Sequence, residues 1–109
     1  MNVRLYVWQR TSAAIMAPLV VVHLLVIFYA MRKGFSAAEI LSRTRGSVAW
    51  ALFYGLFIAA ASVHAPIGLR TILAEWTPLP ARMRDVAVIA FGVALAVLGF
   101  RAIAAVVLS

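Results

Sequence analysis

The sequence predicts an all-α fold: a three-helix transmembrane bundle with a short interfacial helix after the first span, forming a single membrane-anchor domain over residues 1–109. Hydrophobic residues make up 66% of the chain and charged residues only 12%, which is too few charges to cover a soluble domain of this size. Three apolar runs also approach the length needed to cross a hydrocarbon core of about 30 Å. We expect the spans at about residues 13–31, 47–69 and 84–106.

The first span follows two arginines, Arg4 and Arg10. Residues 13–31 carry no charge and would measure about 28 Å as a helix. Basic residues before an apolar run are also typical of a signal peptide. This run, however, is too long and reaches Arg32 and Lys33 without a small-residue cleavage site. We therefore expect a span that is retained in the mature protein.

The link to the second span contains signals for the end of one helix and the start of another. Gly34 directly follows Arg32 and Lys33, an order typical of a helix end. Ser36 and Glu39 have the spacing of a capping box, in which the serine accepts from a backbone N–H and the glutamate reaches back. These signals predict the short interfacial helix.

Two prolines separate the second span from the third. Residues 47–69 form the longest charge-free run of the chain, and Pro78 and Pro80 then interrupt any helix, because neither can donate a backbone hydrogen bond. The third charge-free run, residues 86–100, is shorter. Arg101 can extend its charged group to the membrane surface, however, and the apolar character continues to Leu108, which supports a third span.

The charges, the absence of cysteine and the motifs together exclude several classes of function. Ten Lys and Arg residues against three Asp and Glu residues give a net charge of +7. Because the basic residues fall at the edges of the apolar runs, they indicate anchoring in a lipid bilayer and no nucleic-acid partner. The absence of cysteine excludes disulfides, iron–sulfur ligation and covalently attached heme. The chain also lacks the motifs of a hydrolase or a phosphate-binding enzyme, so we expect no catalytic residue in this chain alone.

One ionisable residue, His64, lies inside the second predicted span. Such a residue is costly in a bilayer and indicates a functional site. Ala60, Ala61 and Gly68 lie one turn away on the same helix face, and small residues there leave room for a flat macrocycle. If one ring nitrogen binds iron, the other needs an acceptor that the sequence does not name. A histidine hydrogen-bonded across a helix interface, with the small residues permitting close packing, is the alternative.

With three alternating spans, Arg10 at the start of the first and Arg70 at the end of the second lie at the same membrane face. Other polar and aromatic residues gather at that face: Trp8, Gln9, Ser12, Glu75 and Trp76. Such a cluster, opening onto an apolar interior, suits a lipophilic redox headgroup. An ordinary belt of aromatic and arginine residues would have the same composition.

Two motifs carry a resemblance to a known family. They read His64-x3-Gly68-Leu69-Arg70-x4-Glu75-Trp76 and Gln9-Arg10-Thr11-Ser12. Together they resemble the motifs of the larger cytochrome b556 membrane anchor subunit of succinate dehydrogenase and fumarate reductase, and the resemblance covers the whole three-span layout. Four positions depart from the family pattern: Gln9 replaces a histidine, Ala13 a glycine and Glu75 an aspartate, and Tyr6 stands where a serine is common.

The resemblance implies roles for individual residues. His64 would be an axial ligand of the iron of heme b, and Arg70 would lie near the heme propionates. Arg10 would be a residue of the ubiquinone site, with Ser12 and Tyr6 as further candidates for that site.

The resemblance also implies partners and a location. The chain would anchor an iron–sulfur subunit and a flavoprotein subunit to the membrane and pass electrons from the iron–sulfur subunit to ubiquinone. A second, smaller membrane-anchor chain would supply the other axial histidine. We expect a multi-pass protein of a bacterial or mitochondrial inner membrane, with its N-terminus on the cytoplasmic or matrix side.

The second histidine, His23, is a weaker candidate ligand. If Arg10 and Arg70 are level, His64 lies about 9 Å deep and His23 about 20 Å deep. Two axial nitrogens on one iron are only about 4 Å apart, so the two histidines should not share an iron. His23 can be a polar packing contact, the ligand of a second heme or a residue of a proton path.

Two other functions fit the same spans. One is a heme-free structural or assembly subunit of a respiratory complex, whose histidines only pack. The other is a small proton-coupled transporter subunit, in which His23 and His64 carry protons.

Overall fold

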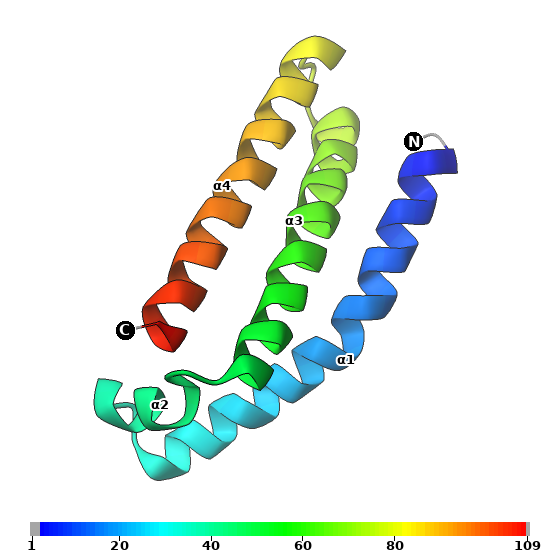
Figure 1. Cartoon of the computed structure of the whole chain (residues 1–109). Helices are drawn as coiled ribbons and strands as arrows, with labels where there is room; N and C mark the ends of the chain where they lie inside the picture. Colours follow the sequence, from blue (N-terminus) through cyan, green and yellow to red (C-terminus); the bar gives the residue numbers. More distant parts are fainter. Residues whose placement is uncertain (1–2, 109) are drawn as a thin grey trace.

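The computed structural model describes residues 3–108, and within this part of the chain the backbone forms four helices and no strand (Figure 1). They are α1 (Val3–Lys33), α2 (Ala37–Thr44), α3 (Val48–Trp76) and α4 (Ala81–Val107). Helices α1, α3 and α4 are long and apolar enough to cross a membrane, and α2 is short. The structure thus confirms the predicted all-α bundle of three spans with a short helix after the first.

Helix α1 runs through Pro18 without a break. A proline inside a helix removes one backbone hydrogen bond and clashes with the preceding turn, so it bends the helix. Figure 1 shows α1 bending part-way along its length. The helix ends as the sequence indicates: Gly34, at a φ of +99°, donates its N–H to the carbonyl of Ala30 at 2.8 Å.

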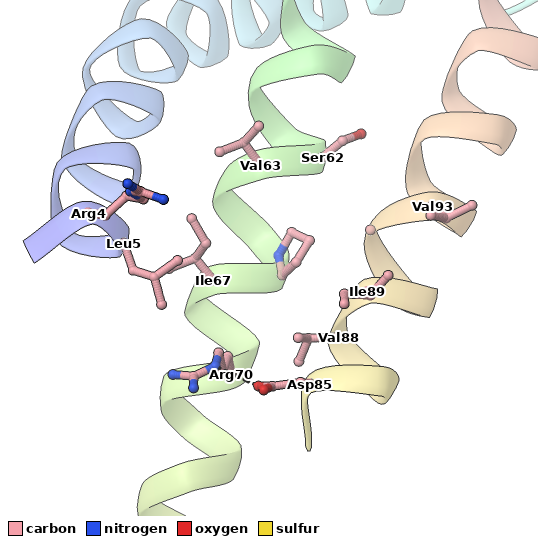
Figure 2. Close-up of a pocket in the computed structure, with 12 residues that line it drawn as sticks. Arg4, Leu5, Ser62, Val63, Ile67, Arg70, Asp85, Val88, Ile89 and Val93 are labelled. Carbon is pink, nitrogen blue, oxygen red and sulfur yellow. Dashed lines mark hydrogen bonds and ion pairs between the residues drawn. The ribbon is translucent and has the colours of Figure 1, made fainter. Parts of the chain in front are cut away.

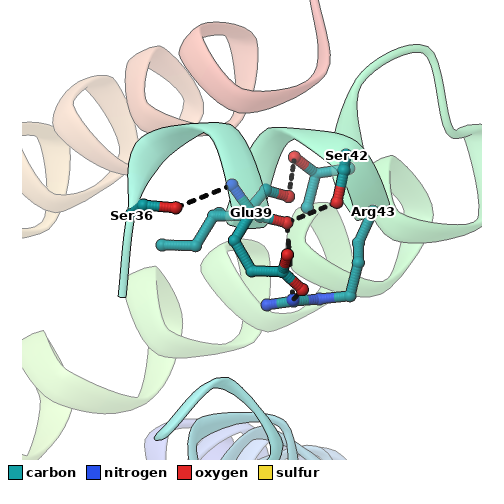
Figure 3. A network of polar contacts seen from close by, with 6 residues as sticks. Ser36, Glu39, Ser42 and Arg43 are labelled. Carbon is teal, nitrogen blue, oxygen red and sulfur yellow. Dashed lines mark hydrogen bonds and ion pairs between the residues drawn. The ribbon is translucent and has the colours of Figure 1, made fainter. Parts of the chain in front are cut away.

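Helix α2 forms half of the predicted capping box (Figure 3). The Ser36 hydroxyl accepts from the Glu39 N–H at 3.0 Å, as expected. The Glu39 carboxylate pairs with Arg43 at 3.3 Å, one turn further on, which replaces the expected return bond to Ser36. Opposite charges four residues apart on a helix attract, and this pair takes the carboxylate away from the cap.

The far end of α2 is fixed to the end of α4. The buried hydroxyl of Thr44 donates to the carbonyl of Val106 at 2.8 Å, and the N–H of Gly46 donates to the carbonyl of Val107 at 2.7 Å. These two bonds satisfy carbonyls that the last turn of a helix leaves without a partner. Figure 1 shows α2 and the C-terminus at the same end of the bundle.

Helix α3 starts at a serine cap, with the Ser47 hydroxyl accepting from the Trp50 N–H at 3.2 Å. It runs through Pro66 and continues to Trp76. Pro66 leaves the carbonyl of Ser62 without its helical donor. Gly92 of α4 approaches this point so closely that an added Cβ would lie 3.3 Å from that carbonyl oxygen and 2.8 Å from Pro66 Cγ.

Helix α3 lies between α1 and α4, and the three long helices alternate in direction (Figure 1). The start of α1, the end of α3 and the start of α4 therefore share one end of the bundle, here called the N-terminal end. Gly99 permits a second close approach of α4, because a Cβ there would fall 2.6 Å from Ile58 Cγ2. Small residues at such contacts let membrane helices pack backbone to backbone.

Candidate functional site

His64 of α3 faces α1 and meets Ser12. The Ser12 hydroxyl lies 3.3 Å from His64 Nδ1 and donates to the carbonyl of Gln9 at 3.0 Å. Ser12 is only 4% exposed, which makes this one of the most enclosed polar contacts in the part of the chain that the structure describes. The contact joins residues 52 positions apart and fixes the rotation of α1 relative to α3.

The other ring nitrogen of His64, Nε2, has no hydrogen-bond partner among residues 3–108. This atom is also not fully enclosed by the described residues. A neutral imidazole with one nitrogen bonded and the other open has the form of a metal ligand.

The small residues around His64 serve helix packing. A Cβ added at Gly68 would lie 3.5 Å from Gln9 Nε2, an ordinary packing distance, and Ala60 is buried. The space at Gly68 is therefore next to Gln9 of α1. Of the two explanations that the sequence left open for these residues, close helix packing describes Gly68.

Arg10 and Tyr6 lie one helical turn apart on α1 and are exposed. The Arg10 guanidinium carbon lies 5.8 Å from the centre of the Tyr6 ring, within the range of a cation–π contact. No hydrogen bond or ring contact joins either residue to His64 in the part of the chain that the structure describes. The structure thus separates the predicted ubiquinone residues: Ser12 is buried against His64, whereas Arg10 and Tyr6 remain available to a ligand or partner.

Arg70 is engaged on a different side of α3 from His64. Its Nε donates to Asp85 Oδ1 of α4 at 2.8 Å, which forms an ion pair between the two helices (Figure 2). Six residues of helix turn Arg70 by about 120° from His64. The terminal nitrogens of Arg70 make no hydrogen bond within residues 3–108, so the guanidinium can hold Asp85 and still offer donors to an anion.

The Arg70–Asp85 pair borders an open cleft at the N-terminal end of the bundle (Figure 2). The cleft has a volume of about 570 Å³ and lies between the start of α1, the second half of α3 and the first half of α4. Its charged groups are Arg4, Arg70 and Asp85, and its other walls are mostly apolar side chains. A cleft of this size, with charged groups on otherwise mostly apolar walls, suits an amphiphilic molecule.

His23 lies in an aromatic cluster away from His64. Its ring meets Tyr54 and Phe57 edge to face, with ring centres 5.9 and 5.4 Å apart. These two residues precede His64 by ten and seven positions on α3, which places His23 about 10–15 Å from His64 along the helix. Its Nδ1 is buried without a hydrogen-bond partner. The two histidines therefore cannot bind one iron in this chain, as their depths in the sequence indicated.

The two tryptophans of the N-terminal end are exposed. Trp76 is 81% exposed at the end of α3, and Trp8 is 54% exposed on α1. Glu75 is also exposed and has no salt bridge within residues 3–108. Exposed tryptophans at the ends of membrane helices are typical of an aromatic belt. The belt was the alternative to a site for a redox headgroup.

No cluster of ligands in the described residues could hold a metal ion without help, since no three His, Cys, Asp or Glu side chains come together between residues 3 and 108. An iron porphyrin brings four nitrogen ligands of its own and needs from a protein only its axial ligands. His64 thus has the form of a single axial ligand, which is the kind of contribution that a heme requires.

Two partnerships were absent from the sequence-based prediction. Asp85 lies within the first turns of α4, at the same membrane face as Arg70, and this shared face is the signal that could have indicated the ion pair. The contact of Ser12 with His64 had a weaker signal, because it depends on how α1 is rotated about its own axis.

Comparison with known proteins gives one clear result. Residues 1–100 match the family model described as the succinate dehydrogenase/fumarate reductase transmembrane subunit. No significant match was found among curated proteins or among solved structures. The match covers most of the chain and agrees with its three membrane-spanning helices. The chain therefore belongs to the family of transmembrane subunits of succinate dehydrogenase and fumarate reductase.

Proposed function

We propose that the chain is the larger, cytochrome b-type anchor of a succinate:quinone oxidoreductase, in which His64 provides one axial ligand to heme b. The observation that carries this proposal is the state of the His64 ring, with Nδ1 at the buried Ser12 hydroxyl and Nε2 open. A ligand histidine commonly uses one nitrogen for the metal and bonds the other to a fixed group. Heme b, when bound, supplies reversible one-electron transfer.

The second axial ligand comes from a separate, smaller membrane chain. His23 is too far from His64 along α3 to serve the same iron, and the accessible edge of the His64 ring opens away from its Ser12 contact. A heme held between two chains would cover this edge. Arg70 can add charge near the propionates through its terminal nitrogens while Asp85 holds its Nε.

Arg10 and Tyr6 contribute to the ubiquinone site. Both are exposed at the N-terminal end of the bundle, where we also propose that the iron–sulfur subunit docks and carries the flavoprotein subunit. The guanidinium of Arg10 would donate a charge-assisted hydrogen bond to a quinone carbonyl, a bond that gains strength where water is scarce. This end would face the cytoplasm or matrix at a bacterial or mitochondrial inner membrane.

A heme-free anchor is the second candidate, and one observation favours it. A histidine that only packs would also bond across the helix interface, as His64 does with Ser12. The two candidates differ at Nε2 of His64, which binds heme iron in the first candidate and has no ligand in the heme-free anchor. A proton-coupled transporter has less support, because His23 lies among aromatic rings about 10–15 Å from His64.

The test is a reduced-minus-oxidised absorbance spectrum of the purified complex with His64→Ala and His23→Phe as paired variants. We expect a b-type heme signal in the wild-type complex, its loss in His64→Ala and its retention in His23→Phe. A wild-type complex with all its subunits and no heme signal would favour the heme-free anchor. A signal that survives His64→Ala would exclude His64 as the ligand.

A further inference from the structure

The hydroxyl of Ser12 has two close polar neighbours and only one proton to share. Its Oγ lies 3.0 Å from the carbonyl oxygen of Gln9 and 3.3 Å from His64 Nδ1. A carbonyl oxygen can only accept a hydrogen bond, whereas an imidazole nitrogen either donates or accepts according to its tautomer. The bond to Gln9 therefore uses the serine proton. The lone pairs of Oγ are then left to accept from His64.

This proton count determines the tautomer of His64. For the contact with Oγ to be attractive, Nδ1 must carry the ring proton and donate it to Ser12. A neutral imidazole protonated at Nδ1 has its lone pair at Nε2. That is the nitrogen without a hydrogen bond in the described residues, at the accessible edge of the ring.

We infer that Ser12 is a positioning residue that holds His64 as the Nδ1–H tautomer and directs the lone pair of Nε2 toward heme iron. This inference rests on the proposed heme function and names the acceptor that a ligand histidine requires. It assigns to Ser12 a role different from the quinone contact that the family resemblance implies.

The burial of Ser12 supports this role over a quinone contact. The residue is 4% exposed, and α1 and α3 come close one turn further along α3, where Gly68 meets Gln9. A quinone could reach the hydroxyl only if the two helices separated. In the same position the hydroxyl is shielded from water, so no solvent molecule competes with it for the Nδ1 proton.

The hydrogen bond from His64 to Ser12 should also change the midpoint potential of the heme iron. An imidazole that donates from Nδ1 is a more basic ligand, which stabilises ferric iron relative to ferrous iron and lowers the midpoint potential. Removing the acceptor should therefore raise the potential. Outer partners of metal-bound histidines typically change metal affinity by about 10- to 100-fold when they are removed. Each tenfold loss of affinity for ferric iron alone raises the midpoint potential of the heme by about 59 mV.

The experiment compares variants in the assembled complex. Ser12→Ala removes the acceptor, and Ser12→Thr keeps a hydroxyl in the same place. Ser42→Ala is the matched control, because the Ser42 hydroxyl also donates to the carbonyl three residues earlier, at 2.6 Å from Glu39 O, but meets no histidine. The measured quantities are heme b per complex and the midpoint potential of the heme, obtained by redox titration of its absorbance.

We expect Ser12→Ala to raise the midpoint potential and to lower heme retention on dilution. We expect Ser12→Thr to resemble the wild type and Ser42→Ala to change neither quantity. Should Ser12→Ala fail to assemble, Ser12→Cys provides the test. Its thiol is a weaker acceptor, so the potential should move in the same direction by a smaller amount.

The outcomes separate this inference from the function on which it rests. A wild-type complex without heme would refute the proposed function, and the role of Ser12 with it. If heme is present and is lost in His64→Ala, an unchanged potential and heme content in Ser12→Ala would overturn the role of Ser12 alone. Slow quinone reduction in Ser12→Ala with an unchanged heme would overturn it as well and assign Ser12 to the quinone site.

Discussion

Arg10 and Arg70, both at the N-terminal end, are held differently, and this difference affects what each can bind. Arg70 is tied to Asp85 at 2.8 Å, whereas Arg10 lies over the ring of Tyr6 and is exposed. An aromatic ring restricts the guanidinium without using its hydrogen-bond donors. Arg10 is thus better placed than Arg70 to meet an uncharged carbonyl group brought by a ligand.

Replacing Arg10 should slow quinone reduction and spare the dehydrogenase. For Arg10→Gln we expect succinate:quinone reductase activity to fall by roughly 10²-fold, the effect of removing one charge-stabilising donor. Succinate oxidation by an artificial acceptor, measured on the same preparation, should stay at the wild-type rate.

The matched control for Arg10→Gln is Arg45→Gln, which removes an exposed arginine at the opposite end of the bundle. It should leave both activities unchanged. An equal loss of both activities in Arg10→Gln would indicate failed assembly, and no loss in either would remove Arg10 from the quinone site.

The sequence offered candidate residues more readily than their partners. His64 was singled out because an ionisable group inside an apolar run is costly, and Arg10 because its motif resembles that of the family. The partners Ser12 and Asp85 lie on other helices, and the contacts they make depend on how those helices rotate about their axes. Apolar patterns that are nearly uniform around a membrane helix do not encode this rotation.

At the scale of the helices, the predicted signals at Ser36 and Gly34 mark helix ends in the structure, because both act on backbone groups nearby in the chain. Ser47 caps α3 in the same way but was not predicted as a cap. The helices nevertheless extend beyond the charge-free runs, since α1 begins at Val3 and α3 continues to Trp76. Charged residues at a membrane surface remain helical, so a run without charges locates a span but not the ends of its helix.

The packing of α4 on α3 depends on its glycines. An added Cβ at Gly92 would lie 2.8 Å from the rigid Pro66 ring, whereas at Gly55 of α3 it would meet nothing within 4 Å. Alanine gains about 1 kcal/mol over glycine in a helix, and overpacking costs about 1–3 kcal/mol. We expect Gly92→Ala to be less stable than Gly55→Ala by about 1–3 kcal/mol.

Unfolding of the purified complex in detergent, by heat or by graded denaturing detergent, measures this difference between the glycine variants. Equal stability of the two would show that the close approach of α4 to Pro66 carries no packing constraint. A Gly55→Ala variant that is less stable than the wild type would instead place a partner chain against that face.

At the scale of the whole molecule, the described residues form only a small core of their own. Among residues 3–108 no large side chain is fully buried, and the buried apolar residues are small or medium-sized: Ala30, Ala60, Val88 and Val107. Large apolar side chains are exposed along all three spans. Lipid covers part of this surface, and the family to which the chain belongs functions in a complex with other subunits.

The proposed second membrane chain can be tested by leaving it out. Because one axial ligand would then be missing, we expect this chain produced without it to retain less heme than the complex and to show an altered heme spectrum. Heme content per chain and the absorbance spectrum, measured after identical purification, provide the comparison. Full heme content with an unchanged spectrum would mean that a single chain supplies both ligands, against the separation of His23 and His64.

The ligand role of His64 is tested most directly by an electron cryomicroscopy map of the complete complex that resolves the imidazole. We expect iron within bonding distance of Nε2, with Nδ1 directed at the Ser12 hydroxyl and the Arg70–Asp85 ion pair between α3 and α4 intact. A ring that faces acyl chains, or iron bound through Nδ1 with Ser12 turned away, would contradict this assignment.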